Sequence, residues 1–131
     1  MRIPVRRRCL LAGGVAVAAA LAAGGCAQPG TQVPKAQAAK LDVATSRISV
    51  ACGYEEELTA MGGRHPSGLA FVESIAESGA RKLALVFARD QSEIYQGESV
   101  GAVVHDSISL LAGCRLARAR AMLEQAVSHQ R

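Results

Sequence analysis

Apolar residues recur at helical spacing from Leu41 onward, and they mark three amphipathic segments along the chain. At about 100° per residue, the second and third segments each gather their apolar side chains on one side and most of their charged side chains on the other. The first segment is apolar over a wider arc, so we expect it to contact two neighbours; its second apolar sector holds Val43, Val50, Tyr54 and Met61. We therefore predict helices at about 41–61, 67–88 and 91–128. The first helix should end at the adjacent glycines 62 and 63, because glycine accepts the left-handed conformation that follows a helix C-terminus.

Two features of this pattern leave alternatives open. Leu83–Ala88 is apolar enough to form a buried strand, although the helical phase that runs through Gly79 favours a helix. The third segment starts with a sequence that resembles a capping box, Asp90-Gln91-Ser92-Glu93, but Gly97 and Gly101 weaken its beginning. Three helices with short connections predict an all-α, up-down-up bundle in which the first and third helices are parallel.

Residues 1–25 have the three parts of a bacterial secretory signal. Arg2 and the run Arg6–Arg8 form a cationic region, and Leu10–Ala23 is apolar but shorter than the roughly 20 residues that span a bilayer. The paired arginines are similar to a twin-arginine export signal, although an ordinary basic region explains them as well. We expect the segment to direct export and to be removed.

The end of this segment, Ala23-Gly24-Gly25-Cys26, resembles the lipobox of bacterial lipoproteins. The resemblance implies cleavage before Cys26 and attachment of a lipid such as palmitate to that cysteine, which would hold the protein to the outer side of the cell membrane. Leucine is more usual than Ala23 at its position. Cleavage near Ala20–Ala22 or after Ala27, giving a secreted or periplasmic protein, is the alternative, together with an uncleaved anchor.

Residues 26–40 read as a lipidated N-terminus followed by a flexible tether, since Pro29, Gly30 and Pro34 resist regular structure. The folded domain then occupies 41–131. The formal net charge of +4 belongs to the leader, because four of the fifteen basic residues precede Cys26 and the remainder balances the eleven acidic residues. A nucleic-acid partner is therefore not expected, because binding requires clustered positive charge on the folded domain.

Two cysteines remain in the folded domain, and both fall on the apolar sides of predicted neighbouring helices. We predict a Cys52–Cys114 disulfide, as an oxidising compartment favours, with two separate buried thiols as the alternative. If the first and third helices are parallel, charged residues one turn beyond each cysteine must also meet. We predict an ion pair between Glu55 and Arg118, with Arg115 as the alternative partner.

Candidate chemistry is sparse. The sequence holds no nucleophile motif, phosphate-binding loop or zinc spacing, and His65 with Met61 supplies too few ligands for a copper site. We expect neither cofactor nor metal, and no enzymatic activity. The leading hypothesis is a membrane-tethered binding or scaffold module for another envelope protein, centred on Tyr54 and Met61. A small-ligand carrier and an enzyme with a site assembled from scattered residues are the other hypotheses.

Overall fold

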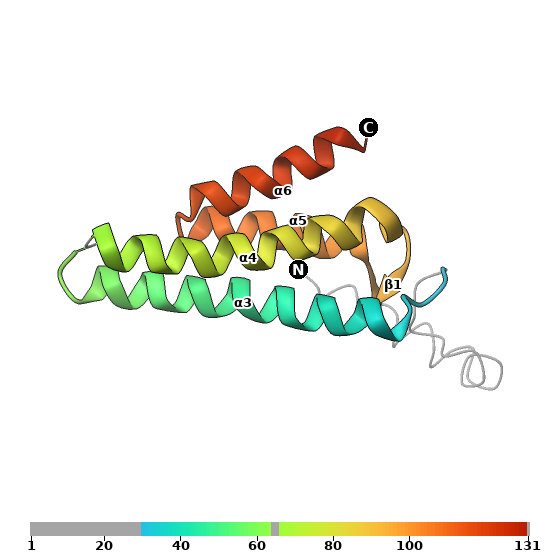
Figure 1. Ribbon diagram of the computed structural model, residues 1–131, viewed down its shortest axis with the longest axis horizontal. Helices are drawn as coiled ribbons and strands as arrows, with labels where there is room; N and C mark the ends of the chain where they lie inside the picture. The colour runs from blue at the N-terminus through green and yellow to red at the C-terminus, as the bar shows by residue number, and fades with distance from the viewer. Residues whose placement is uncertain (1–29, 64–65, 131) are drawn as a thin grey trace, which may run out of the picture.

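The computed structural model describes residues 30–63 and 66–130, and these form an elongated bundle of four helices with one short β-hairpin (Figure 1). The predicted all-α class is confirmed. The elements in chain order are α3 (Lys35–Ala60), α4 (Pro66–Asp90), β1 (Ile94–Tyr95), β2 (Glu98–Ser99), α5 (Val100–Gly113) and α6 (Ala117–His129).

Helices α3 and α4 form a long antiparallel pair, and they match the first two predicted helices (Figure 1). Helix α4 continues through Leu83–Ala88, so the alternative of a buried strand is excluded. The two backbones approach closely at Gly79, where a Cβ atom would lie 2.8 Å from the carbonyl oxygen of Ala44 and 3.0 Å from Ile48. A larger residue would push the helices apart, which explains a glycine in the middle of an apolar helix face.

The core is built from the apolar sectors of α3 and α4, which α5 and α6 cover. The apolar sector of α3 is buried except at its C-terminal end, where Leu58 is partly buried. The buried apolar residues of the two helices are Leu41, Ala44, Ile48, Ala51 and Cys52 on α3 and Val72, Ala76, Ala80, Leu83, Val86 and Phe87 on α4. Aliphatic residues fill most of this volume, and Phe87 and Tyr95 are its buried aromatics. The largest fully buried apolar side chains are Leu41, Ile48, Leu83, Ile94, Leu111, Leu116 and Leu123.

The chain forms a β-hairpin where the third helix was predicted to begin. Strands β1 and β2 are antiparallel and joined by Gln96 and Gly97, which both have positive φ (51° and 82°). This is the backbone of a two-residue turn that matches the right-handed twist of paired strands. Ser99, not Asp90, then caps the next helix by accepting a hydrogen bond from the backbone N–H of Ala102 at 3.1 Å.

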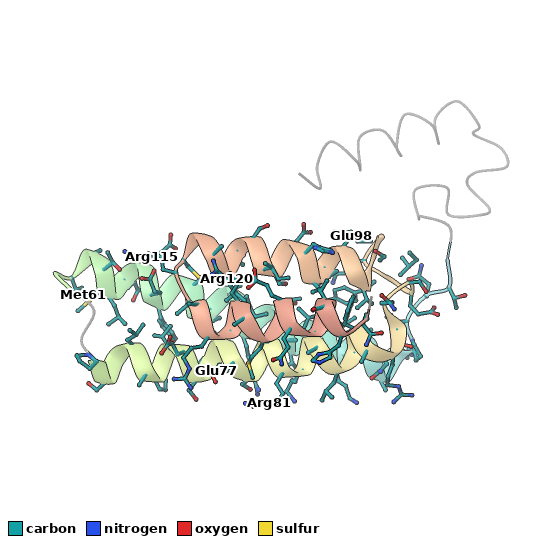
Figure 2. The ribbon with its side chains drawn as sticks, turned by 90° about the horizontal axis from the view of Figure 1, so that it is seen from above. Met61, Glu77, Arg81, Glu98, Arg115 and Arg120 are labelled. Atoms are coloured by element: carbon teal, nitrogen blue, oxygen red, sulfur yellow. A yellow bond between two sulfur atoms is a disulfide. The ribbon has the colours of Figure 1, made fainter. Side chains whose placement is uncertain are left out.

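The third predicted helix is also divided near its middle. Helix α5 ends at Gly113, and the chain turns through Cys114–Leu116 before α6 runs back along the bundle (Figure 2). Arg115 adopts a φ of 61° at this turn, and Leu116 is fully buried. The reversal packs α6 against α4, on the side away from α3 (Figure 1).

The described part of the predicted tether, residues 30–40, belongs to the fold, so the boundary at residue 40 is wrong. Helix α3 begins at Lys35, six residues before the predicted start. Before it, the backbone N–H of Val33 donates to the carbonyl of Ile94 at 2.9 Å. The side chain of Gln37 is buried and donates to Asp90 at 3.0 Å. Residues 31–37 are therefore part of the folded domain.

The predicted signal peptide and the lipidation site at Cys26 lie outside the described residues. Among residues 30–63 and 66–130, none of the helices has the length and apolarity that crossing a bilayer requires.

Candidate interaction surface

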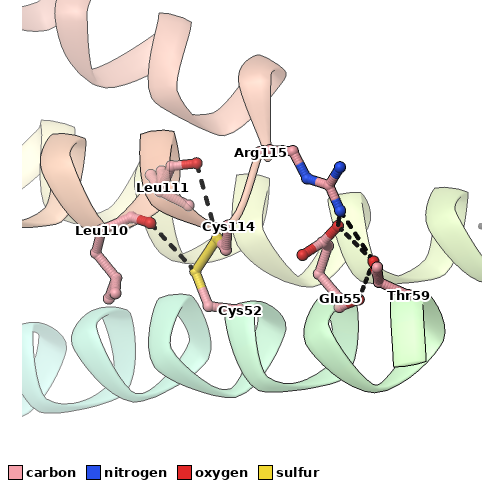
Figure 3. The surroundings of a disulfide bond; sticks show 7 residues. All are labelled: Cys52, Glu55, Thr59, Leu110, Leu111, Cys114 and Arg115. Atoms are coloured by element: carbon pink, nitrogen blue, oxygen red, sulfur yellow. Dashed lines mark hydrogen bonds and ion pairs between the residues drawn. A yellow bond between two sulfur atoms is a disulfide. The ribbon is translucent and has the colours of Figure 1, made fainter.

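The disulfide predicted from the cysteine positions is present. Cys52 on α3 and Cys114 at the end of α5 are bonded, with their Cα atoms 5.3 Å apart (Figure 3). Both residues are buried, so the bond lies within the core. It joins α3 to the turn between α5 and α6, across a sequence separation of 62 residues.

One turn beyond the disulfide, Glu55 is paired with Arg115 (Figure 3). The guanidinium Nη2 of Arg115 lies 3.2 Å from the Glu55 carboxylate and donates to the Thr59 hydroxyl at 3.0 Å. Thr59 also donates to the Glu55 carboxylate at 3.2 Å. Glu55 is only 2% exposed, and these contacts stabilise the carboxylate that the apolar sector would otherwise bury without partners.

Arg118, the partner first predicted for Glu55, lies elsewhere. It contacts Glu77 at 3.2 Å and Glu73 at 3.8 Å, both on α4. The prediction failed because it assumed one continuous helix through residues 114–118. The chain turns at Arg115, so Arg118 is on the first turn of α6 and faces α4 instead of α3. The alternative partner, Arg115, is the correct one.

The two residues proposed as the centre of an interaction surface are both exposed. Tyr54 of α3 is 43% exposed. Met61 is 81% exposed and lies at the end of the molecule where α3 leads to α4 (Figure 2). Together with Phe71 of α4, which is 62% exposed, they border a shallow depression of about 170 Å³. The surface of the depression is almost wholly apolar, although one charged residue borders it. The rest of its lining consists of Glu57, Leu58, Gly68 and Val72.

The apolar surface extends beyond this depression along both helices. Seven large hydrophobic side chains are exposed in the described part of the chain. Leu110 lies on α5, and the other six lie on α3, at its C-cap or on α4. The exposed α3 residues share one helical stripe, and Phe71 and Leu85 share one on α4, fourteen residues apart. Arg47 bonds to Ser78 between the stripes, which places them side by side. We call this surface the α3–α4 face: Val43, Val50, Tyr54, Met61, Phe71 and Leu85.

A second feature, which the sequence did not reveal, is a polar groove on the other side of α3. It has a volume of about 440 Å³ and lies between α3, the β-hairpin and α5. Tyr95, at its edge, donates a hydrogen bond to the Asp42 carboxylate. The lining contains hydroxyl groups and two carboxylates but no basic side chain: Asp42, Thr45, Ser46, Ile48, Ser49, Tyr95, Gln96, Asp106, Ser107 and Leu110.

Within the described ranges, no group of three or more histidine, cysteine, aspartate or glutamate side chains is arranged to hold a metal ion. His65, considered above with Met61 as a copper ligand, lies outside those ranges. Comparison of the chain with protein-family models, with curated proteins and with solved structures finds no match.

Proposed function

We propose that this protein is an exported bacterial lipoprotein, anchored by Cys26 to the outer side of the cell membrane, whose helical domain is a non-enzymatic binding or scaffold module of the cell envelope. The α3–α4 face is the observation that carries the proposal. Six large exposed apolar side chains share this face, and three of them, Tyr54, Met61 and Phe71, border one apolar depression. Exposed apolar surface that gathers on one side of a protein is typical of sites that bind another macromolecule.

Two features support export. The first 26 residues have the order of basic, apolar and small residues that a lipoprotein signal requires. The Cys52–Cys114 bond is of the kind that persists in oxidising compartments outside the cytoplasm. The first feature comes from the leader and the second from the core of the folded domain, so they are independent.

Anchoring is tested by replacing the lipidated cysteine in the full chain. Cys26→Ala should move the protein from the membrane fraction to the soluble fraction or leave it as an uncleaved precursor. Cys9→Ala is the matched control and should stay with the membrane, because Cys9 precedes the cleavage site. Mass spectrometry of the native N-terminal peptide should show an acylated Cys26. An unmodified Cys26, or cleavage at another position, would contradict the anchor.

Binding is tested by placing a photo-crosslinking residue on the proposed surface in living cells. A crosslinker at Met61, in the α3–α4 face, should give a discrete adduct with an envelope component. A crosslinker at Glu56 is the matched control, since Glu56 is also exposed on α3 but points away from that face. Equal labelling from both positions, or none from Met61, would argue against a docking role.

The polar groove supports a second candidate function, the carriage of a small ligand. Its volume accommodates a small molecule, and its hydroxyl and carboxylate groups suit a polar ligand that is neutral or cationic. We would add spermidine or glucosamine to the purified protein and measure its melting temperature. A rise that Ser46→Trp abolishes, by filling the groove, would support this function. No shift with either compound would count against it.

A further inference from the structure

Six exposed residues, five on α3 and Met61 at its C-cap, form a stripe along one side of the helix. They are separated by alternating steps of four and three residues, the spacing by which two helices pack along a common seam. All six are exposed, whereas the α3 residues of the core belong to a different sector of the helix. The stripe consists of Val43, Arg47, Val50, Tyr54, Glu57 and Met61.

The spacing of the stripe residues is symmetric about the level of Cys52. The steps are four, three, four, three and four, so reversing the helix superimposes each position on another member of the stripe. Reversal places Val43 opposite Met61 and Val50 opposite Tyr54, two apolar pairs. Related by a twofold axis, two copies of such a helix make each contact twice.

The two charged members of the stripe also match under this reversal. Arg47 falls opposite Glu57, so an antiparallel pair of helices contains two pairs of opposite charges. A parallel pair in register would set each residue against its own copy, with Arg47 facing Arg47 and Glu57 facing Glu57. Like charges at such short range are repulsive, so the charges select the antiparallel arrangement.

The hydrogen bond that Arg47 makes to Ser78 is compatible with this contact. The guanidinium group carries five N–H donors, and only one of its nitrogens, Nη1, takes part in the bond to Ser78. Phe71 and Leu85 of α4 flank the stripe and widen the contact from one helix to two. That width matters because a single pair of helices buries less surface than a typical specific interface.

We infer that the partner of the α3–α4 face is a second copy of this chain, with two α3 helices packed antiparallel about a twofold axis at the level of Cys52. The inference rests on the proposed function, in that it assigns an occupant to the same docking face. It specifies which residues meet: Val43 with Met61, Arg47 with Glu57, and Val50 with Tyr54 of the second copy.

Charge reversal provides the sharpest test, using two differently tagged full chains co-expressed in a bacterial envelope and extracted in mild detergent. Arg47→Glu alone, or Glu57→Arg alone, should reduce co-purification of the two tags by about tenfold, because each reversal turns both attractive contacts into repulsive ones. Mixing one Arg47→Glu copy with one Glu57→Arg copy should restore co-purification, since both contacts are again between opposite charges. The double reversal in one chain should restore it too.

Disulfide trapping tests the geometry without depending on the charge variants. A Val50→Cys copy should crosslink to a Tyr54→Cys copy. Two Met61→Cys copies should not crosslink to each other, because an antiparallel pair separates these positions by about 27 Å along the axis. Crosslinking of Met61→Cys with itself, or single reversals that associate as well as the native chain, would overturn the inference, and so would a mixture of reversed copies that stays apart.

The outcome is separable from that of the proposed function. A chain that stays monomeric while Met61 crosslinks to a different envelope protein would refute self-association and leave a docking role in place. A dimer with an unmodified Cys26 would refute the membrane anchor and leave self-association in place.

Discussion

Loss of the Cys52–Cys114 bond should weaken this domain strongly. The bond ties α3 to the turn between α5 and α6, and the two sulfur-bearing residues are 62 positions apart in the sequence. Without it, the unfolded chain regains the freedom that a closed loop of this length removes. The core contains few aromatic residues, so burial of apolar side chains offsets little of this gain in the entropy of the unfolded chain.

The size of the effect follows from the length of the loop. Closing a loop of about sixty residues lowers the entropy of the unfolded chain enough to contribute about 4 kcal/mol at room temperature. A domain of about 100 residues loses several degrees of melting temperature per kcal/mol, so we expect Tm to fall by about 20 °C. A natural domain with a typical free energy of unfolding of about 5–15 kcal/mol would keep only part of that stability after the bond is lost.

The measurement is urea unfolding of the purified protein with and without a reductant, followed by circular dichroism. The native chain should lose about 4 kcal/mol on reduction. The double variant Cys52→Ala, Cys114→Ala serves as the control and should show no response to the reductant. Its stability should lie slightly below that of the reduced native chain, because it also lacks two buried sulfur atoms.

A loss of less than about 1 kcal/mol on reduction would refute this reasoning, because the entropy of the closed loop would then not be what stabilises the fold. A similar response to the reductant in the double alanine variant would assign the effect to the reagent and not to the bond.

Two further predictions concern helix contacts and the buried carboxylate. Gly79→Ala should destabilise the fold by about 1–2 kcal/mol in thermal unfolding, since its Cβ would lie 2.8 Å from a carbonyl oxygen of α3. Gly53→Ala is the control and should stabilise the fold by about 0.5–1 kcal/mol, because a Cβ there has nothing within 4 Å. Equal effects of the two substitutions would contradict the close approach of α3 and α4 at Gly79. In a double-mutant cycle, Arg115→Asn and Glu55→Gln should show about 1 kcal/mol of coupling, while the exposed Arg118→Ala should cost less than about 1 kcal/mol. Additive effects of the first two would deny the ion pair an energetic role.

The sequence predicted the parts of the fold that depend on side-chain periodicity. The apolar sectors of α3 and α4 identified both helices and most of their buried residues, and the position of the cysteines on apolar faces identified the disulfide. These features are set by residues that must be buried together, and burial leaves a regular trace in the sequence.

The two turns were harder to predict from the sequence, each for a different reason. The hairpin after α4 has a sequence signal in Gln96-Gly97, a glycine-containing pair between short strands. Gly97 was interpreted only as a weak point at the beginning of a helix, because the pattern at Asp90 resembles a capping box. The turn at Arg115 had no signal, because arginine does not favour positive φ and the apolar spacing continues through it. The disulfide at Cys114 and the Glu55 contact act on this turn from α3, so it depends on tertiary structure.

The candidate surface was predicted in part. Tyr54 and Met61 were identified because the apolar arc of the first helix was too wide for one neighbour, and both are exposed. Phe71 and Leu85 were missed as surface residues because the α4 pattern was interpreted only as a core face. The polar groove lies between α3, the hairpin and α5. Its lining could not be predicted, because the periodicity of one segment does not indicate which other segments lie beside it.

The backbone contact between residues 31–33 and Ile94 also limits how far the domain can stand from a bilayer. If Cys26 carries the lipid, only about five residues separate it from Thr31, a reach of roughly 17 Å when fully extended. A bundle on so short a linker stays close to the lipid headgroups. Two copies paired antiparallel have their attachment points at opposite ends, so the pair would rest lengthwise on the bilayer, where confinement to two dimensions favours even a weak association.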